Sequence, residues 1–339
     1  MNATSTTHTR RGPTAREVVV TGIGLALPGA ATYGDLLGPL PGEGGFDPAT
    51  GLIGRELRHK DRASRLALRA AESALRDAGL TDADNTFTGT ADATAVVVST
   101  NLGNADSVCE ATDTIATAGV MDLSPLGLPQ TSSNVIAGWV AIRYRLRGPN
   151  LTVCNGATSG LDAVTWARNL IMAGRAEAAV VVGVEPATDV ATKVLGQQST
   201  DAAVAVVLEP ADTAASRGAR PRAAVTGYAR ARNLAAALAW AEVTQEEPVG
   251  LWLADGAEAA EAGRLLAAPR RIDLESQLGP LSGALGVLQC AAAAAFLEGG
   301  ATGNVLATAG GPRHDATAAL LLTPPPASRP STQERGQHP

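Results

Sequence analysis

The chain has 339 residues, of which 45% are hydrophobic and 18% charged, so it can bury a sizeable core in one large or two ordinary domains. Its net charge of −6 argues against nucleic-acid binding, because neutralising phosphates requires a basic face. No apolar run is long enough to cross a bilayer, and residues 1–16 lack the apolar segment of a signal peptide. We therefore expect a cytoplasmic protein with no nucleic-acid or membrane partner.

Three cysteines, Cys109, Cys154 and Cys290, are too few and too scattered for a disulfide framework or a zinc site. This count is typical of a reducing compartment, and we expect neither a metal nor another cofactor. Cys109 and Cys290 lie in segments interpreted as helical or loop, where they are expected to act as small core residues.

Short β-branched segments alternate with alanine-rich segments, which is typical of an α/β protein. The expected strands are residues 17–24, 93–99, 178–185, 202–209, 222–229, 249–254, 304–309 and 317–323. The expected helices are residues 61–78, 133–146, 160–173, 256–267 and 283–298. The first helix is the clearest, because Asp61 can cap its start and Gly79 can end it. The polar segments 1–16 and 324–339 are expected to be disordered tails.

The order of these elements indicates an internal duplication. Residues 17–24 and 222–229 both form a strand that contains Thr-Gly, and each opens a similar series of strands and helices. We predict two similar halves, residues 17–210 and 211–323.

Residues 151–167, "LTVCNGATSGLDAVTWA", have the pattern of an active-site turn. An extended apolar segment enters small residues and then opens a helix, whose N-terminal amides favour negative charge and can convert a thiol to a thiolate. The residue at the tip of the turn is Ala157, which has no reactive group. The sequence therefore predicts a nucleophile turn that lacks its nucleophile.

Several segments resemble the β-ketoacyl synthases, the condensing enzymes of fatty-acid and polyketide assembly. In the family's order, these segments are residues 18–24, 60–80, 134–153 and 157–185, followed more weakly by 281–300 and 309–322. The resemblance implies a thiolase-like fold, in which two similar αβαβα halves form five layers, here shortened relative to typical members. It also implies a dimer.

The resemblance implies that the condensing chemistry is lost. Such enzymes use a cysteine nucleophile, two histidines and a supporting lysine. Matching the surrounding residues places Ala157 at the nucleophile, Asp255 and Pro280 at the two histidines, and Glu275 at the lysine. We therefore predict that the chain is not a β-ketoacyl synthase by itself.

Four residues remain candidates for a different chemistry: His314, Asp255, Cys154 and Glu275. His314 follows the Gly-Gly loop that lies beside the nucleophile in relatives, although a surface position is the simpler interpretation. Asp255 is interpreted first as a solvated loop carboxylate. Cys154 is expected to be buried in the strand and unreactive. Asp162 is interpreted as favouring the helix dipole and local packing.

A remnant of the acyl pocket is expected beside the turn, because the residues there are small. Its predicted lining is Ala157, Thr158, Pro280, Gly310 and Gly311. Glu275 is expected at the margin of this pocket, with His314 close by.

Three functions fit these observations. The leading one is a partner subunit resembling the chain-length factor of type II polyketide systems, which pairs with an active ketosynthase and works with an acyl carrier protein. Its contacts would come from the strand at 151–154, the helix 133–146 and the loop around 100–130. The alternative is a repurposed enzyme that cyclises, isomerises, dehydrates or transfers a carrier-bound polyketide. The third is a homodimeric scaffold that binds an acyl carrier protein.

Overall fold

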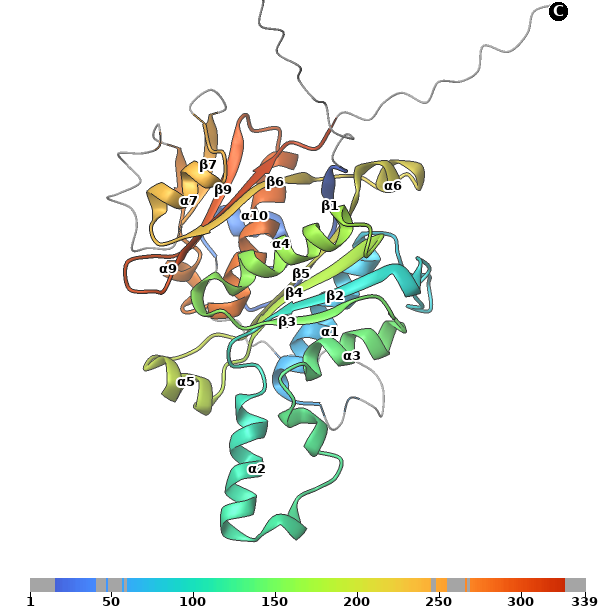
Figure 1. Ribbon diagram of the computed structural model, residues 1–339, viewed down its shortest axis with the longest axis vertical. Helices are drawn as coiled ribbons and strands as arrows, with labels where there is room; N and C mark the ends of the chain where they lie inside the picture. Colours follow the sequence, from blue (N-terminus) through green and yellow to red (C-terminus); the bar gives the residue numbers. More distant parts are fainter. Residues whose placement is uncertain are drawn as a thin grey trace, which may run out of the picture.

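The computed structural model describes residues 16–40, 47, 57, 60–244, 248–254, 266 and 269–326. Its strands form one mixed sheet in the order β3-β2-β4-β5-β1-β6-β10-β9-β7-β8 (Figure 1). The strands are β1 (Val18–Ala26), β2 (Thr94–Ser99), β3 (Asn150–Val153), β4 (Ala178–Glu185), β5 (Ala202–Pro210), β6 (Ala223–Ala231), β7 (Val249–Leu253), β8 (Arg270–Ile272), β9 (Asn304–Gly310) and β10 (Thr317–Thr323). The described helices are α1 (Arg62–Asp77), α2 (Ala105–Thr117), α3 (Val135–Tyr144), α4 (Ser159–Met172), α5 (Asp189–Leu195), α6 (Ala211–Ser216), α7 (Leu234–Trp240), α9 (Glu275–Leu278) and α10 (Leu285–Glu298).

The sheet consists of two halves with the same pattern of strand pairing. In the first half, β1 pairs with β5 and β5 with β4 antiparallel, whereas β4 with β2 and β2 with β3 run parallel. In the second half, β6, β10, β9, β7 and β8 repeat this series in the same order and with the same directions. The halves meet where β1 pairs antiparallel with β6. The strand pattern therefore agrees with the duplication that the sequence predicts.

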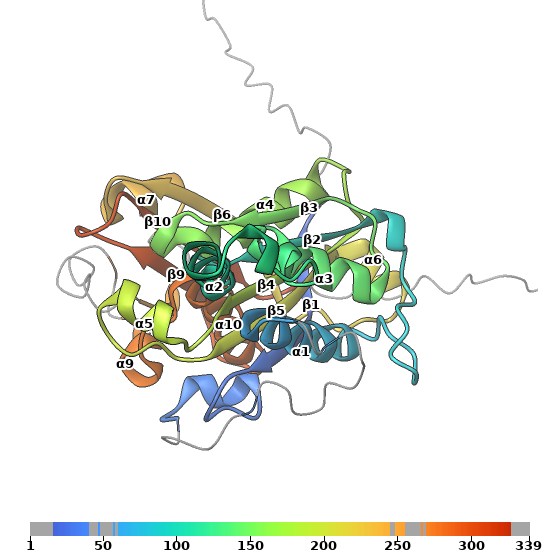
Figure 2. The ribbon, with the colours of Figure 1, turned by 90° about the horizontal axis from the view of Figure 1, so that it is seen from below.

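Helices lie on both faces of the sheet and between its two halves (Figure 2). One face of β2, β4 and β5 packs against α1 and α3, and one face of β6, β9 and β10 packs against α7. The opposite faces of both halves enclose α4 and α10 in the largest core cluster. Because α10 is apolar all round, every residue from Leu285 to Phe296 can be buried. This order of layers is helix, sheet, helix, sheet, helix.

The two central helices approach each other at a pair of glycines. A Cβ atom on Gly160 would lie 2.5 Å from the backbone nitrogen of Gly286, which leaves no room for any side chain at this crossing. The crossing places the N-terminus of α4, and therefore the turn that carries Ala157, against the start of α10.

The structure agrees with all eight predicted strands and with four of the predicted helices, to within a few residues at their ends. The fifth helix, predicted at 256–267, lies almost wholly outside the described residues, as do the predicted tails. The segment around 100–130, interpreted as a loop, instead contains α2. The interpretation of Cys109 as a core residue is wrong, because Cys109 lies exposed on α2, while Cys290 is buried on α10 as expected. No described helix has the length and apolarity needed to span a membrane.

Candidate functional site

The turn between β3 and α4 is a single 3-10 turn, Gly156–Thr158, and Ala157 at its centre is half-buried. It lies against a second 3-10 turn, Ser282–Ala284, and against β9, the strand that ends at Gly310. Segments from both halves of the chain therefore meet at Ala157. This is where the sequence places the lost nucleophile.

Asn101, in the loop after β2, holds the turn in place. Its side-chain oxygen accepts hydrogen bonds from the amide of Gly156 at 3.1 Å and from the hydroxyl of Ser159 at 3.0 Å. Its side-chain nitrogen donates to the carbonyl of Gly156 at 3.0 Å and to the hydroxyl of Ser282 at 2.9 Å. A single amide therefore ties together the turn, the start of α4 and the opposite half of the chain.

Glu185, at the end of β4, is a carboxylate buried beside this network, with 3% of its surface exposed. It accepts hydrogen bonds from the amide of Asn101, from the amide of Leu102 at 3.1 Å and from the hydroxyl of Thr100 at 3.2 Å. Burial is the largest influence and raises the pKa of Glu185 from 4.5 to about 7, although these hydrogen bonds oppose the shift. Glu185 therefore anchors the loop that presents Asn101.

A second polar cluster fixes the other side of the turn around Asp162, which is buried in the first turn of α4. Asp162 accepts hydrogen bonds from the side chains of Asn155 at 2.9 Å and Thr158 at 2.8 Å, and from the hydroxyl of Tyr228. Arg230 donates to the Thr158 hydroxyl at 3.1 Å. Hydrogen bonds therefore hold the turn from two directions, through Asn101 on one side and Asp162 on the other.

Glu275 and Pro280 lie next to this network. The carboxylate of Glu275 accepts hydrogen bonds from the amides of Leu281 at 2.7 Å and Ser282 at 3.4 Å, so it fixes the segment that carries Ser282. Pro280 is half-buried and has no side-chain donor. Asp255 lies outside the described residues.

The Gly-Gly loop after β9 is buried at Gly310 and Gly311, whereas His314 is exposed to solvent. Two cavities, of about 530 Å³ and 1030 Å³, lie elsewhere, and Ala157 lines neither of them. The predicted acyl pocket beside Ala157 therefore stays a prediction.

The expectation that Cys154 is buried is wrong, because the residue is exposed just beyond the end of β3. Its sulfur lies 3.9 Å from the carbonyl oxygen of Asn101. Partial burial of the thiol and the charge of Glu185 both raise the pKa of Cys154, which favours the unreactive thiol over the thiolate.

Sequence reasoning missed the residues that organise the turn: Asn101, Glu185, Tyr228 and Arg230. The sequence did offer one indication of Glu185. A carboxylate directly after the apolar segment 178–184 is expected to be buried, and a buried carboxylate requires hydrogen-bond donors around it. Asn101, Tyr228 and Arg230 meet the turn only through tertiary packing, and their local sequences contain no comparable signal.

The two half-sheets around α4 and α10 define a thiolase-like fold. Two solved structures share it. The ishigamide ketosynthase/chain length factor matches with a TM-score of 0.73 and 21% sequence identity. The AntDE:AntF complex, a type II PKS acyl-carrier protein with its ketosynthase, matches with a TM-score of 0.76 and 18% sequence identity. Each comparison covers 91% of this chain and 99% of the other.

The sequence comparisons identify the family. The family model described as "Beta-ketoacyl synthase, N-terminal domain" matches residues 30–204, just over half of the chain. The chain therefore belongs to the β-ketoacyl synthase family, as the sequence resemblance implied.

Two relatives illustrate the extent of this similarity. The 3-oxoacyl-[acyl-carrier-protein] synthase 2 of Rhizobium meliloti (strain 1021) is 31% identical over 216 residues, which cover 55% of this chain and 50% of the relative. A Streptomyces halstedii protein whose name describes a polyketide β-ketoacyl synthase 1 is 34% identical over 188 residues, which cover 48% and 44%. The chain thus spans about half the length of these relatives.

Proposed function

We propose that this chain is a non-condensing subunit of a polyketide or fatty-acid-type synthase, with a role like that of a chain-length factor. The observation that carries the proposal is Ala157 just before α4, an unreactive residue in a turn that hydrogen bonds hold in shape. Glu275 and Pro280 support it, since the first is engaged with backbone amides and the second has no donor.

The partner is a ketosynthase-like subunit, and an acyl carrier protein delivers substrate to the pair. The two solved neighbours, a ketosynthase/chain length factor and a carrier protein in complex with its ketosynthase, support this kind of assembly. The surface supports it too. Among the described strands, β3 is an edge that pairs only with β2, and an exposed edge is an association surface.

Apolar side chains flank this edge. The helices α3 and α4 both pack against β3, and they carry Ile142 and Trp166, which are 66% and 53% exposed. We propose that β3, Ile142 and Trp166 form the centre of the contact with the ketosynthase-like subunit, because large exposed apolar side chains next to a strand edge favour burial in an interface.

Co-expression of the full chain with a ketosynthase-like subunit, followed by native mass measurement, tests the proposal. We expect a one-to-one complex that is lost with Trp166→Glu and kept with Trp240→Glu, because Trp240 is also exposed but lies on α7, which packs against β6 and β10 in the other half of the sheet. A homodimer of this chain that forms no complex with the co-expressed ketosynthase-like subunit would contradict the proposal. Turnover of a carrier-bound polyketide by this chain alone would replace it with the repurposed-enzyme alternative.

A further inference from the structure

The segment 105–131, here called the α2 arm, extends away from the sheet (Figure 1). No residue of α2 is buried. A helix of 13 residues is marginally stable in water by itself, so α2 requires packing beyond its contacts with α5 and with residues 120–122 and 128–131. Large apolar side chains are exposed along the arm, namely Val108, Ile115, Val120, Met121, Leu126 and Leu128. We infer that another molecule covers the arm.

The arm is also strongly acidic. It carries Asp106, Glu110, Asp113 and Asp122, and the sequence contains no lysine or arginine between Arg76 and Arg143. Within the described residues, none of the four carboxylates forms an ion pair. A covering surface that is only apolar would leave these charges to be desolvated without compensation.

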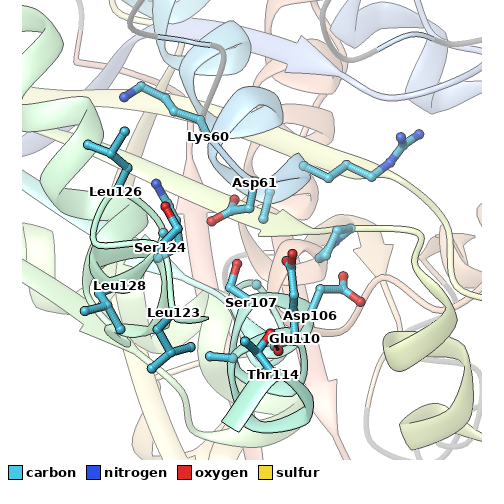
Figure 3. Close-up of a pocket in the computed structure, with 17 residues that line it drawn as sticks. Lys60, Asp61, Asp106, Ser107, Glu110, Thr114, Leu123, Ser124, Leu126 and Leu128 are labelled. Atoms are coloured by element: carbon cyan, nitrogen blue, oxygen red, sulfur yellow. Dashed lines mark hydrogen bonds between the residues drawn. The ribbon is translucent and has the colours of Figure 1, made fainter. Parts of the chain in front are cut away.

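A groove of about 530 Å³ lies between α2 and residues 123–130 of the arm and extends to the start of α1 (Figure 3). Carboxylates and leucines line opposite sides of it. The carboxylates are Asp61, Asp106 and Glu110, and the leucines are Leu123, Leu126 and Leu128. Such a groove fits a ligand that combines a positive charge with an apolar stem, as lysine and arginine side chains do.

The two cations that line the groove are engaged elsewhere. The ammonium of Lys60 lies 3.1 Å from the centre of the Trp139 ring, and Arg62 forms an ion pair with Asp201. These contacts of both cations are made with groups other than Asp106 and Glu110.

Asp61 lines the groove at the start of α1. Its Oδ1 atom caps α1 by accepting from the amide of Ser64 at 2.6 Å, while its Oδ2 atom is buried with no hydrogen-bond partner among the described residues. Burial is the largest influence and raises the pKa of Asp61, the charge of Asp106 adds to the shift, and hydrogen bonds from Ser64 and the charge of Arg65 oppose it. A metal ion is not indicated, since the described residues contain no group of three side chains arranged to hold one.

We propose that the α2 arm docks against an apolar surface of the partner subunit, and that the groove binds an arginine or lysine side chain projecting from that surface. The inference rests on the proposed function, because the partner is the same ketosynthase-like subunit. It adds the chemistry of the contact: carboxylates on this chain face basic and apolar side chains on the other. A contact of this kind selects a partner by charge as well as by shape.

Two charge-matched double variants test the groove in the co-expressed complex. Asp106→Asn with Glu110→Gln removes two groove charges while preserving side-chain shape. Asp84→Asn with Glu177→Gln removes two exposed charges away from the groove and is the control. We expect the groove variant to weaken the complex by at least about tenfold and to flatten its salt dependence, because partner cations lose their counter-charges. Equal affinities for the two variants would overturn the proposal.

A peptide probe separates this inference from the proposed function. The probe is a synthetic helical peptide with leucines and an arginine on one face, and its control carries citrulline in place of the arginine. We expect the arginine peptide to bind the wild-type chain and the control variant about tenfold more tightly than the groove variant. Equal binding of both peptides, or no binding of either, would overturn the groove proposal. Peptide selectivity without a ketosynthase complex would instead contradict the proposed partner and leave the groove assignment intact.

Discussion

The side-chain amide of Asn101 donates a hydrogen bond to the hydroxyl of Ser282 at 2.9 Å, and so connects the two halves of the chain at the turn that carries Ala157. The same amide bonds to both the carbonyl and the amide of Gly156. The turn is therefore kept in shape by polar contacts that do not depend on a reacting group. This explains how the turn can keep its form with an unreactive alanine at position 157.

The first prediction concerns the contribution of Asn101 to stability. Asn101→Ala should lower the free energy of unfolding by about 1–3 kcal/mol, because the part-buried hydroxyls of Ser159 and Ser282 each lose a hydrogen bond. Urea unfolding at fixed protein concentration measures the change. The control is Asn134→Ala, which removes an exposed side chain bonded only to Ser132 and should cost less than about 0.5 kcal/mol. Similar losses for the two variants would contradict the bridging role of Asn101.

The second prediction is a pH dependence that comes from Glu185. Its pKa is about 7 in the folded protein against an ordinary value of 4.5, so the folded state binds more protons between these values. The free energy of unfolding should therefore fall as the pH rises from about 4.5 to 7, by roughly 3 kcal/mol from this one group. Below that window Glu185 is protonated in both the folded and the unfolded state, so its titration no longer changes the free energy of unfolding.

Chemical unfolding of the wild type and of Glu185→Gln at a series of pH values isolates this effect, since glutamine does not titrate. The stability difference between them should change across the window and stay constant above it. Glu177→Gln, at an exposed position, is the control and should follow the wild type. Parallel pH profiles for the wild type and Glu185→Gln would show that Glu185 titrates normally.

Most strands of the fold could be predicted from sequence because they are short apolar runs, such as the valine-rich segments 94–99 and 178–184. The helix α2 could not, because it has no buried face and only two large aliphatic side chains, Val108 and Ile115, which are too few to show the period that identifies a helix. β8 was missed because its three residues include two arginines. In both cases the environment of the element, rather than its own residues, determines the structure.

In the candidate site, too, some features could be predicted from local sequence and others depended on tertiary structure. The position of Ala157 followed from local sequence, since a strand, small residues and a helix succeed one another within residues 151–167. The exposure of Cys154 did not, because β3 turned out to be an edge strand, and an edge leaves its last residues uncovered. Asn101 and Glu185 meet 84 residues apart in sequence, a contact that requires the parallel pairing of β2 with β4.

The third prediction tests the glycine crossing between α4 and α10. Gly160→Ala would place a Cβ atom 2.5 Å from the nitrogen of Gly286, so one helix must shift, at a cost of about 1–3 kcal/mol of stability. Gly138→Ala, in the helix α3, is the matched control. Its Cβ atom would meet nothing within 4 Å, so it should stabilise the helix by up to about 1 kcal/mol. Thermal unfolding of both variants measures the contrast, and equal effects of the two substitutions would contradict the close crossing.

The last prediction is that Ala157→Cys does not restore condensation. The variant supplies a thiol at the start of α4, but condensation also requires donors that stabilise the enolate formed from malonyl carrier protein, and losing one such donor typically costs about a hundredfold or more. Pro280 has no donor to offer, and the carboxylate of Glu275 is committed to the amides of Leu281 and Ser282. Release of carbon dioxide from malonyl carrier protein measures the activity, while alkylation by iodoacetamide verifies that the introduced thiol is accessible. An accessible thiol without decarboxylation is the expected result, because the nucleophile alone leaves the enolate unsupported. Condensation at the rate of an active synthase would contradict this prediction. It would mean that residues other than Glu275 and Pro280 supply those donors.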